Sequence, residues 1–159
     1  EQERFFRNSL TTAAARGVPM LVTNPDLVRP GSMAPMPGRL GKLYAGELGG
    51  EVTYIGKPHN GANTNGVYDR ALAILAEQGV SDLDRVCMVG DAMETDIRGA
   101  ALNGLGGSVL IGHGIHSESL GLEQGKGAGE TMDQGRLEEL LEGYDDEERP
   151  TYAIPAFNW

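Results

Sequence analysis

The sequence predicts an α/β protein with a three-layer, doubly wound parallel sheet. From about residue 51 onward, short apolar segments alternate with segments of helical periodicity, in the order strand, helix, strand, helix, strand, helix, strand. Each connection between strands is long enough to hold a helix, which implies that consecutive strands pair in parallel. Glycine and proline residues stand at most of the expected element ends, as they do in globular α/β domains.

Composition excludes several classes of partner. The 159 residues carry a net charge of −10, so a general nucleic-acid surface and an anionic membrane surface are both unexpected. No apolar run approaches the roughly 18 residues that a membrane span needs. The single cysteine, Cys87, cannot form an intrachain disulfide, which favours a cytoplasmic location, and its apolar neighbours predict that it is buried.

The first 50 residues predict a separate module. Residues 1–16 have a helical apolar stripe, residues 19–22 form a short strand, and residues 38–48 form a second helix. The strand ends in Thr23-Asn24-Pro25-Asp26, a turn in which proline fixes the backbone and the polar side chains can bond nearby amides. A proline-rich loop at residues 29–38 separates the strand from the second helix.

The stretch from Val86 to Ala100 is the centre of the predicted fold. Residues 86–89 are apolar and predict a buried strand, which Gly90 ends. Asp91 follows directly, and residues 92–101 predict a helix with Met93, Ile97 and either Ala100 or Ala101 on one apolar face. Asp91 and Asp96 therefore lie near a strand end and a helix start, where open α/β sheets bind ligands.

The remaining elements place a lysine at the same sheet edge. Residues 52–55 predict a strand that ends at Gly56-Lys57-Pro58, and proline prevents a helix from starting at Lys57. Further elements are expected at residues 67–78 (helix), 108–111 (strand), 136–141 (helix) and 152–154 (edge strand), and residues 145–149 are expected to be a solvated charge run.

Lys57, Asp91 and Asp96 are the candidate catalytic residues. Taken singly, each has an ordinary structural explanation: a surface lysine, a helix cap and a first-turn carboxylate favoured by the helix dipole. Together they suit phosphate chemistry, because Mg²⁺ is held by one or two carboxylates plus substrate phosphate, and lysine neutralises phosphate as a point charge. Asp91 and Asp96 are therefore the expected Mg²⁺ residues.

Two of these motifs resemble a known family. Gly56-Lys57-Pro58 and Gly90-Asp91-Ala92-Met93-Glu94-Thr95-Asp96 are similar to the third and fourth motifs of haloacid dehalogenase (HAD) superfamily hydrolases. Thr23-Asn24-Pro25-Asp26 resembles a turn in the cap of class IIA, the NagD and nitrophenylphosphatase-like group. His113-Gly114-Ile115-His116 and residues 151–159 look typical of one bacterial-type branch of that class.

The resemblance implies a Mg²⁺-dependent phosphate-ester hydrolase that acts on a small phosphorylated metabolite. In that family an aspartate attacks phosphorus, and water then hydrolyses the aspartyl-phosphate. By motif, Lys57 would steady the nucleophile and the phosphate, Asp91 would ligate Mg²⁺, and Asp96 would support the metal site. The turn residues Asn24, Pro25 and Asp26, together with Lys57, would bind substrate.

The nucleophile motif of the family, Asp-x-Asp-Gly after a first strand, is absent from these residues. Asp82-Leu83-Asp84 has the spacing, but it precedes a strand and so faces the wrong sheet edge. The expectation is therefore the C-terminal portion of such an enzyme, with residues 1–50 a remnant of the α/β cap and residues 51–159 part of the core. That portion alone is expected to be inactive, and its unpaired strand edge is expected to cause self-association.

Other readings remain open at the level of sequence. The same residues would also suit a non-catalytic phosphate- or metal-binding module or a degenerate partner subunit. A receiver-like domain would need an acidic pair after its first strand, which is lacking, and zinc is disfavoured because His59, His113 and His116 have no thiolate partners. Residues 60–66 resemble an insertion after the lysine motif, which leaves the loop geometry near Lys57 open.

Overall fold

The computed structural model describes residues 2–29, 32, 34–58, 66–123 and 129–157. Within these ranges the helices are α1 (Gln2–Ala15), α2 (Pro37–Gly46), α3 (Val67–Glu77), α4 (Arg98–Leu102) and α5 (Gln134–Leu141). The strands are β1 (Met20–Val22), β2 (Val52–Tyr54), β3 (Cys87–Gly90), β4 (Gly107–Ile111) and β5 (Tyr152–Ile154). His59, nearly all of the loop at residues 60–66, and residues 158–159 lie outside the described part of the chain.

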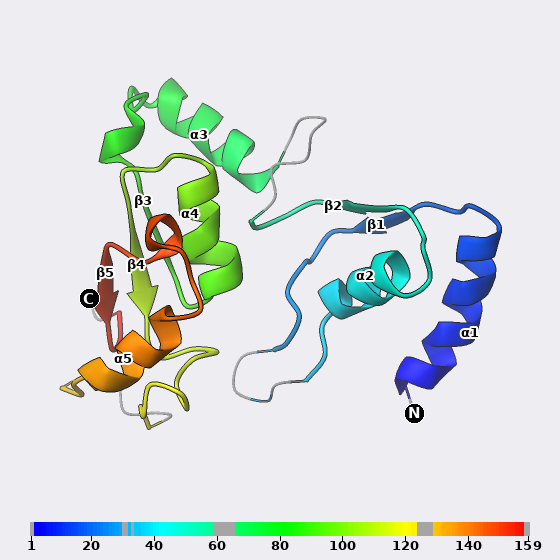
Figure 1. Ribbon diagram of the computed structural model, residues 1–159. Helices are drawn as coiled ribbons and strands as arrows, with labels where there is room; N and C mark the ends of the chain where they lie inside the picture. Colours follow the sequence, from blue (N-terminus) through cyan, green and yellow to red (C-terminus); the bar gives the residue numbers. More distant parts are fainter. Residues whose placement is uncertain (1, 30–31, 33, 59–65, 124–128, 158–159) are drawn as a thin grey trace.

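The strands form two parallel sheets (Figure 1), which confirms the α/β class. β1 pairs with β2, with Met20 opposite Val52, and β3, β4 and β5 form a second sheet in that order. Helices connect the strands within each sheet, as parallel pairing requires. β5 lies at an edge of its sheet, as predicted.

One strand belongs to a different sheet from the one expected. The sequence predicted that the strand at residues 52–55 continues the sheet of residues 86–89, but β2 pairs only with β1 in the described structure. Periodicity identifies a strand without identifying its neighbour, because pairing depends on contacts between distant segments. The division of the chain at residue 50 stays a prediction.

The β1–α2–β2 unit is held together by the buried face of α2. Leu43 and Tyr44 are 6% and 1% exposed, and the Tyr44 hydroxyl donates a hydrogen bond to the carbonyl of Val18, just before β1. Full burial of such a side chain stabilises a fold by about 1.5–3 kcal/mol. This unit therefore fixes the position of the residues that follow β1 and β2.

The three-stranded sheet packs on a core formed by Met93, Ile97 and Leu110, each at most 1% exposed. The apolar side chains of Leu137, Leu140 and Leu141 of α5 pack against this core. The predicted apolar face is buried at Met93, Ile97 and Ala100, whereas Ala101 is half-buried.

The helix after β3 is not a uniform α-helix. Met93–Ile97 form a π-helical turn, and α4 follows directly. The carbonyl of Ala92 accepts hydrogen bonds from the amides of both Asp96 and Ile97, at 2.9 and 3.2 Å. A π-helical turn is rare and occurs often at functional sites, and the apolar periodicity of the segment could not distinguish it from an α-helix.

β3 is more exposed than the sequence predicted. Val89 is 43% exposed and Cys87 is also exposed, so the expectation of a fully buried strand and a buried cysteine was wrong. The physical reason is that β3 lies at the edge of its sheet in the described structure, with alternate residues uncovered. Apolar composition indicates that a strand can be buried, but not whether a neighbour covers it.

The charge run at residues 145–149 takes part in the fold. A short 3₁₀ helix spans Asp146–Glu148, and Glu148 forms an ion pair with Arg98 of α4 at 2.9 Å. This segment is therefore attached to the helix after β3, where the sequence predicted only solvation. No helix in the described ranges is long and apolar enough to cross a membrane.

Candidate functional site

The carboxyl ends of both sheets open onto one cavity of about 490 Å³, which we call the charged cavity. The residues after β2 reach it through Lys57, and the residues after β3 reach it through Asp91. Its ionisable lining side chains are Asp26, Lys42, Tyr54, Lys57, Asp91, Glu94, Asp96, Arg98 and His116. The three candidate catalytic residues thus line the same cavity, although they follow strands of different sheets.

Lys57 and Asp96 form an ion pair between Nζ and Oδ1. The Asp96 side chain is 3% exposed, whereas that of Lys57 is 39% exposed. A carboxylate this deeply buried requires a partner, because an unpaired buried charge is costly. The contact therefore joins the end of β2 to the π-helical turn after β3.

The second oxygen of Asp96 is also engaged. Oδ2 accepts a hydrogen bond from the backbone amide of Ala92 at 3.2 Å. The carboxylate lies directly against Gly90, where an added Cβ would be 2.2 Å from the Asp96 Cγ. Glycine at position 90 is thus needed for the Asp96 carboxylate to approach the backbone of β3 closely. Asp96 also fixes the turn that carries Asp91.

Asp91 is held from the loop after β4. Its Oδ2 accepts a hydrogen bond from the amide of Ile115 at 3.1 Å. A Cβ added at Gly114 would be 2.1 Å from this oxygen, so the absence of a side chain there makes room for the carboxylate. The other oxygen, Oδ1, accepts no hydrogen bond from another residue of the described structure.

His116 lies beside the same turn. Its Nε2 accepts a hydrogen bond from the amide of Met93 at 3.4 Å. Burial lowers the pKa of His116 below its usual value, while Glu94 and Asp91 act in the opposite direction. The neutral imidazole is the form that can accept the Met93 hydrogen bond.

Tyr68 of α3 contacts the π-helical turn, to which Thr95 belongs. The Tyr68 hydroxyl donates to the backbone carbonyls of Thr95 and Asp96, both at 3.4 Å. Burial, with a smaller contribution from Asp96, raises the pKa of Tyr68 to about 12. Thr95 lines the charged cavity, and its buried hydroxyl has no hydrogen-bond partner in the described structure.

The carboxylates of the charged cavity suit a magnesium ion better than a metal that needs three or more protein ligands. Within the described residues no group of three or more His, Cys, Asp or Glu side chains is placed to hold a metal. Mg²⁺ needs only one or two carboxylates and completes its shell with water and phosphate oxygens. Asp91 has an oxygen available for such an ion, whereas both Asp96 oxygens already accept protein donors.

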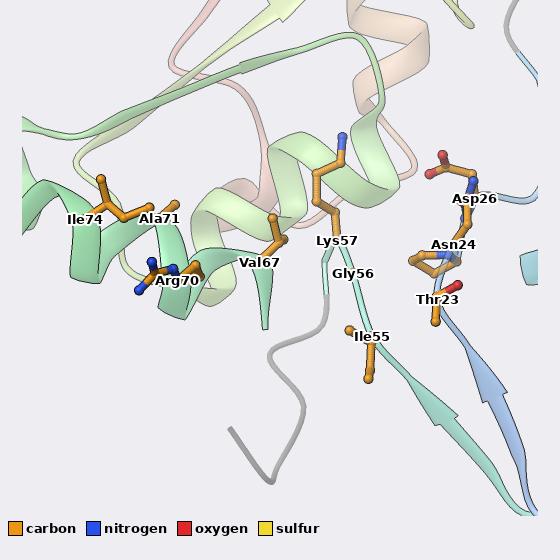
Figure 2. Close-up of a pocket in the computed structure, with 11 residues that line it drawn as sticks. Thr23, Asn24, Asp26, Ile55, Gly56, Lys57, Val67, Arg70, Ala71 and Ile74 are labelled. Carbon is orange, nitrogen blue, oxygen red and sulfur yellow. Dashed lines mark hydrogen bonds between the residues drawn. The ribbon is translucent and has the colours of Figure 1, made fainter. Parts of the chain in front are cut away.

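The turn after β1 borders the charged cavity and a second, more apolar cavity of about 730 Å³. Asn24, Pro25 and Asp26 line the apolar cavity, and Pro25 and Asp26 also line the charged cavity. Figure 2 shows Thr23, Asn24 and Asp26 on one side and α3 residues on the other, with Gly56 and Lys57 between them. The Asn24 side chain accepts a hydrogen bond from the Asp26 amide at 3.0 Å, which stabilises the turn itself.

Sequence reasoning missed several residues that shape this site. Gly114 and Ile115 hold Asp91, Tyr68 contacts the π-helical turn, and Lys42 lines the cavity from α2. The loop His113-Gly114-Ile115-His116 entered the sequence predictions only through the resemblance and the zinc argument, and no contact with Asp91 was predicted for it. Its place directly after a parallel strand was the available signal, because such loops meet at the ligand-binding edge.

Comparisons with known proteins identify the family and the fold of this chain. Residues 54–134, just over half of the chain, match the family model described as HAD-hydrolase-like. The chain matches the crystal structure of a haloacid dehalogenase-like hydrolase from Brucella suis 1330, with 26% identity and a TM-score of 0.65 over 98% of this chain and 50% of that chain. No curated protein matches the chain.

Two further structures share the fold at lower identity. A p-nitrophenyl phosphatase from Archaeoglobus fulgidus has 24% identity and a TM-score of 0.56, over 92% of this chain and 46% of that chain. A thermostable NPPase double mutant from Geobacillus stearothermophilus has 24% identity and a TM-score of 0.54, over 92% and 45%. The chain thus spans about half the length of these solved structures. The match over residues 54–134 establishes that the chain belongs to the HAD-hydrolase-like family, as its lysine and aspartate motifs predicted.

Proposed function

We propose that this chain is the C-terminal portion of a Mg²⁺-dependent phosphate-ester hydrolase. The observation that carries the proposal is the convergence of Lys57, Asp91 and Asp96 on one cavity at the carboxyl ends of two parallel sheets. Family membership supports hydrolase chemistry. The nucleophilic aspartate, which would form an aspartyl-phosphate, belongs in this proposal to a segment outside the 159 residues.

Each of the three residues has a separate role in the proposal. Lys57 neutralises the phosphate of the substrate with its ammonium group. Asp96 holds Lys57 in place through their ion pair and fixes the turn after β3 through the Ala92 amide. Asp91, with its available oxygen, is the metal ligand, and Gly114 and Ile115 orient its carboxylate.

The proposed metal is Mg²⁺, held by Asp91, with Asp96 supporting the site from the adjacent turn. When bound, Mg²⁺ supplies positive charge to the phosphate oxygens and helps to orient the substrate. Mg²⁺ takes most of its ligands from water and substrate oxygens, so a site that offers few protein carboxylates suits it.

The proposed substrate is a small phosphorylated metabolite. The charged cavity of about 490 Å³ is within the size range of small-molecule sites. Asn24, Pro25 and Asp26 would contact the substrate at the entrance, where they border the cavities. The net charge of −10 makes a nucleic-acid substrate unfavourable.

The test compares hydrolysis of phosphate monoesters by the full-length protein and by its Asp91→Asn variant. The variant Asp91→Asn should lose its response to Mg²⁺, and kcat/KM for phosphate monoesters should fall about 1000-fold, because metal charge stabilisation is worth several kcal/mol. Asp84→Asn, an exposed aspartate outside both cavities, is the control and should retain activity. Undiminished, Mg²⁺-dependent turnover by Asp91→Asn would contradict the proposed mechanism.

The 159-residue chain provides a second test. It should bind inorganic phosphate in the presence of Mg²⁺ but hydrolyse no phosphate ester, because it lacks the Asp-x-Asp-Gly nucleophile motif after a strand. Mg²⁺-dependent turnover by the purified chain would contradict the proposed position of the nucleophile. A full-length protein that binds phosphate without turnover would instead support the alternative of a non-catalytic phosphate-binding module.

A further inference from the structure

One positively charged side chain of the charged cavity, that of Lys42, has no role in the proposed hydrolysis. Three of the cavity's lining residues are lysine or arginine: Lys42, Lys57 and Arg98. Lys57 is paired with Asp96, and Arg98 is paired with Glu148 at 2.9 Å. Lys42 forms no hydrogen bond or ion pair with any residue in the described ranges.

Lys42 and the candidate metal residue Asp91 reach the cavity from different sheets of the fold. Lys42 lies in α2, between β1 and β2, whereas Asp91 follows β3 in the second sheet. The position of α2 is fixed by the buried side chains of Leu43 and Tyr44, next to Lys42 in sequence. The lysine is therefore presented to the cavity by a rigid element, although its own side chain is exposed.

We infer that Lys42 recognises a second anionic group on the substrate, such as a carboxylate or a second phosphate. This inference rests on the proposed function, since Lys57 and the metal would take the ester phosphate. Of the lysine and arginine residues in the described cavity lining, Lys42 is the one with neither an acidic partner nor a role in the proposed hydrolysis. The substrate class is thus a small phosphate monoester that carries an additional acid group, in preference to one with a neutral leaving group.

A matched pair of probes tests this assignment. 3-Phosphoglycerate and glycerol 3-phosphate share a phosphate and a three-carbon skeleton, and they differ by a carboxylate against a hydroxymethyl group. Binding of each to the 159-residue chain is measured by ³¹P NMR titration with Mg²⁺ present. We expect 3-phosphoglycerate to bind more tightly, by about five-fold, which is the size expected for one exposed charge pair.

Three variants assign the preference to Lys42. Lys42→Met keeps much of the aliphatic stem and should weaken 3-phosphoglycerate about five-fold while changing glycerol 3-phosphate less than two-fold. Lys42→Arg keeps the charge and should restore most of the preference. Arg16→Gln removes one positive charge from an exposed residue outside the cavity and should leave both affinities unchanged.

The outcomes separate this inference from the proposed function. Equal binding of the two probes, or a preference that survives in Lys42→Met, would overturn the role of Lys42 and leave the phosphate site intact. Failure of both probes and of inorganic phosphate to bind would overturn the phosphate site, and the role of Lys42 with it.

Discussion

Lys57 and Asp96 form an ion pair that joins the two parallel sheets of this protein. Lys57 follows β2, in the sheet with β1, and Asp96 lies in the π-helical turn after β3. The carboxylate is 3% exposed and the lysine side chain 39% exposed, so the pair extends from the interior to the edge of the charged cavity. Loss of either partner should therefore affect both the stability of the fold and the geometry of the site.

The first prediction concerns this pair. Lys57→Met should lower the free energy of unfolding by about 2 kcal/mol, below the cost of breaking a fully buried pair because Lys57 is partly exposed. In a double-mutant cycle with Asp96→Asn, urea denaturation should give a coupling energy of about 1 kcal/mol.

The control for this cycle is another ion pair of the same chain. Arg7 and Glu47 approach to 2.6 Å, but their side chains are 41% and 58% exposed. Arg7→Met should cost less than about 0.5 kcal/mol, because solvent screens an exposed pair. Equal effects of Arg7→Met and Lys57→Met would show that the burial of Asp96 does not strengthen its pairing.

The second prediction concerns the space around Asp91. In Gly114→Ala the new Cβ would overlap Asp91 Oδ2, so the carboxylate must move. We expect Mg²⁺ affinity to fall about ten-fold, which is typical when the support of a metal ligand is lost. Isothermal titration calorimetry with Mg²⁺ measures the change.

Gly143→Ala is the matched control for this substitution. An added Cβ at Gly143 has no atom within 4 Å, and the residue is exposed and outside the charged cavity. Its Mg²⁺ affinity should equal that of the unaltered chain. If Gly114→Ala also bound Mg²⁺ with unaltered affinity, the contact between Gly114 and Asp91 would have no role in the metal site.

The third prediction is a pH dependence at alkaline pH. Burial and Asp96 raise the pKa of Tyr68 from 10.0 to about 12, so folding favours the neutral phenol. The resulting stabilisation is fully present below pH 10 and is lost as the pH rises through about 12, because the unfolded chain loses the Tyr68 proton first. The shift corresponds to a decrease on the order of 2 kcal/mol.

Tyr68→Phe isolates this contribution. The variant has no phenol to ionise, so its free energy of unfolding should decline less between pH 10 and pH 12 than that of the unaltered chain. Urea denaturation at several pH values measures the difference between the two curves. Parallel curves would show that Tyr68 ionises equally in the folded and unfolded states.

The fourth prediction concerns the exposed edge of the second sheet. β3 has a neighbour on one side only in the described structure, and Val89 is 43% exposed. An exposed apolar edge strand is a template for pairing, so we expect the isolated chain to self-associate with increasing concentration. Val89→Lys should weaken this association, since an edge lysine opposes strand pairing.

Leu102→Lys is the control for the edge substitution. Leu102 is 59% exposed at the end of α4 and is not part of β3. The substitution therefore adds the same charge and removes a comparable apolar side chain without changing the edge strand. Sedimentation velocity should show association close to that of the unaltered chain. A stable monomer at high concentration, without any substitution, would contradict the prediction.

The elements themselves follow from the sequence because their signals are local. Apolar periodicity and terminal glycine or proline residues predicted the helices and strands to within a few residues at most ends, including the apolar face that contains Met93 and Ile97. The lysine and aspartate motifs predicted the family. The sequence placed Lys57, Asp91 and Asp96 at one sheet edge, whereas in the structure they follow strands of two different sheets and line one cavity.

Tertiary structure alone decided which strands pair and what surrounds the candidate residues. β2 pairs with β1, and β3 is exposed at an edge, because pairing and burial depend on segments far apart in the sequence. Contacts between distant segments also bring Gly114 and Ile115 to Asp91. They likewise place Lys42 in the charged cavity. Sequence determined which chemical groups follow each strand, whereas the packing of the two sheets determined which of those groups meet, because local periodicity carries no information about distant neighbours.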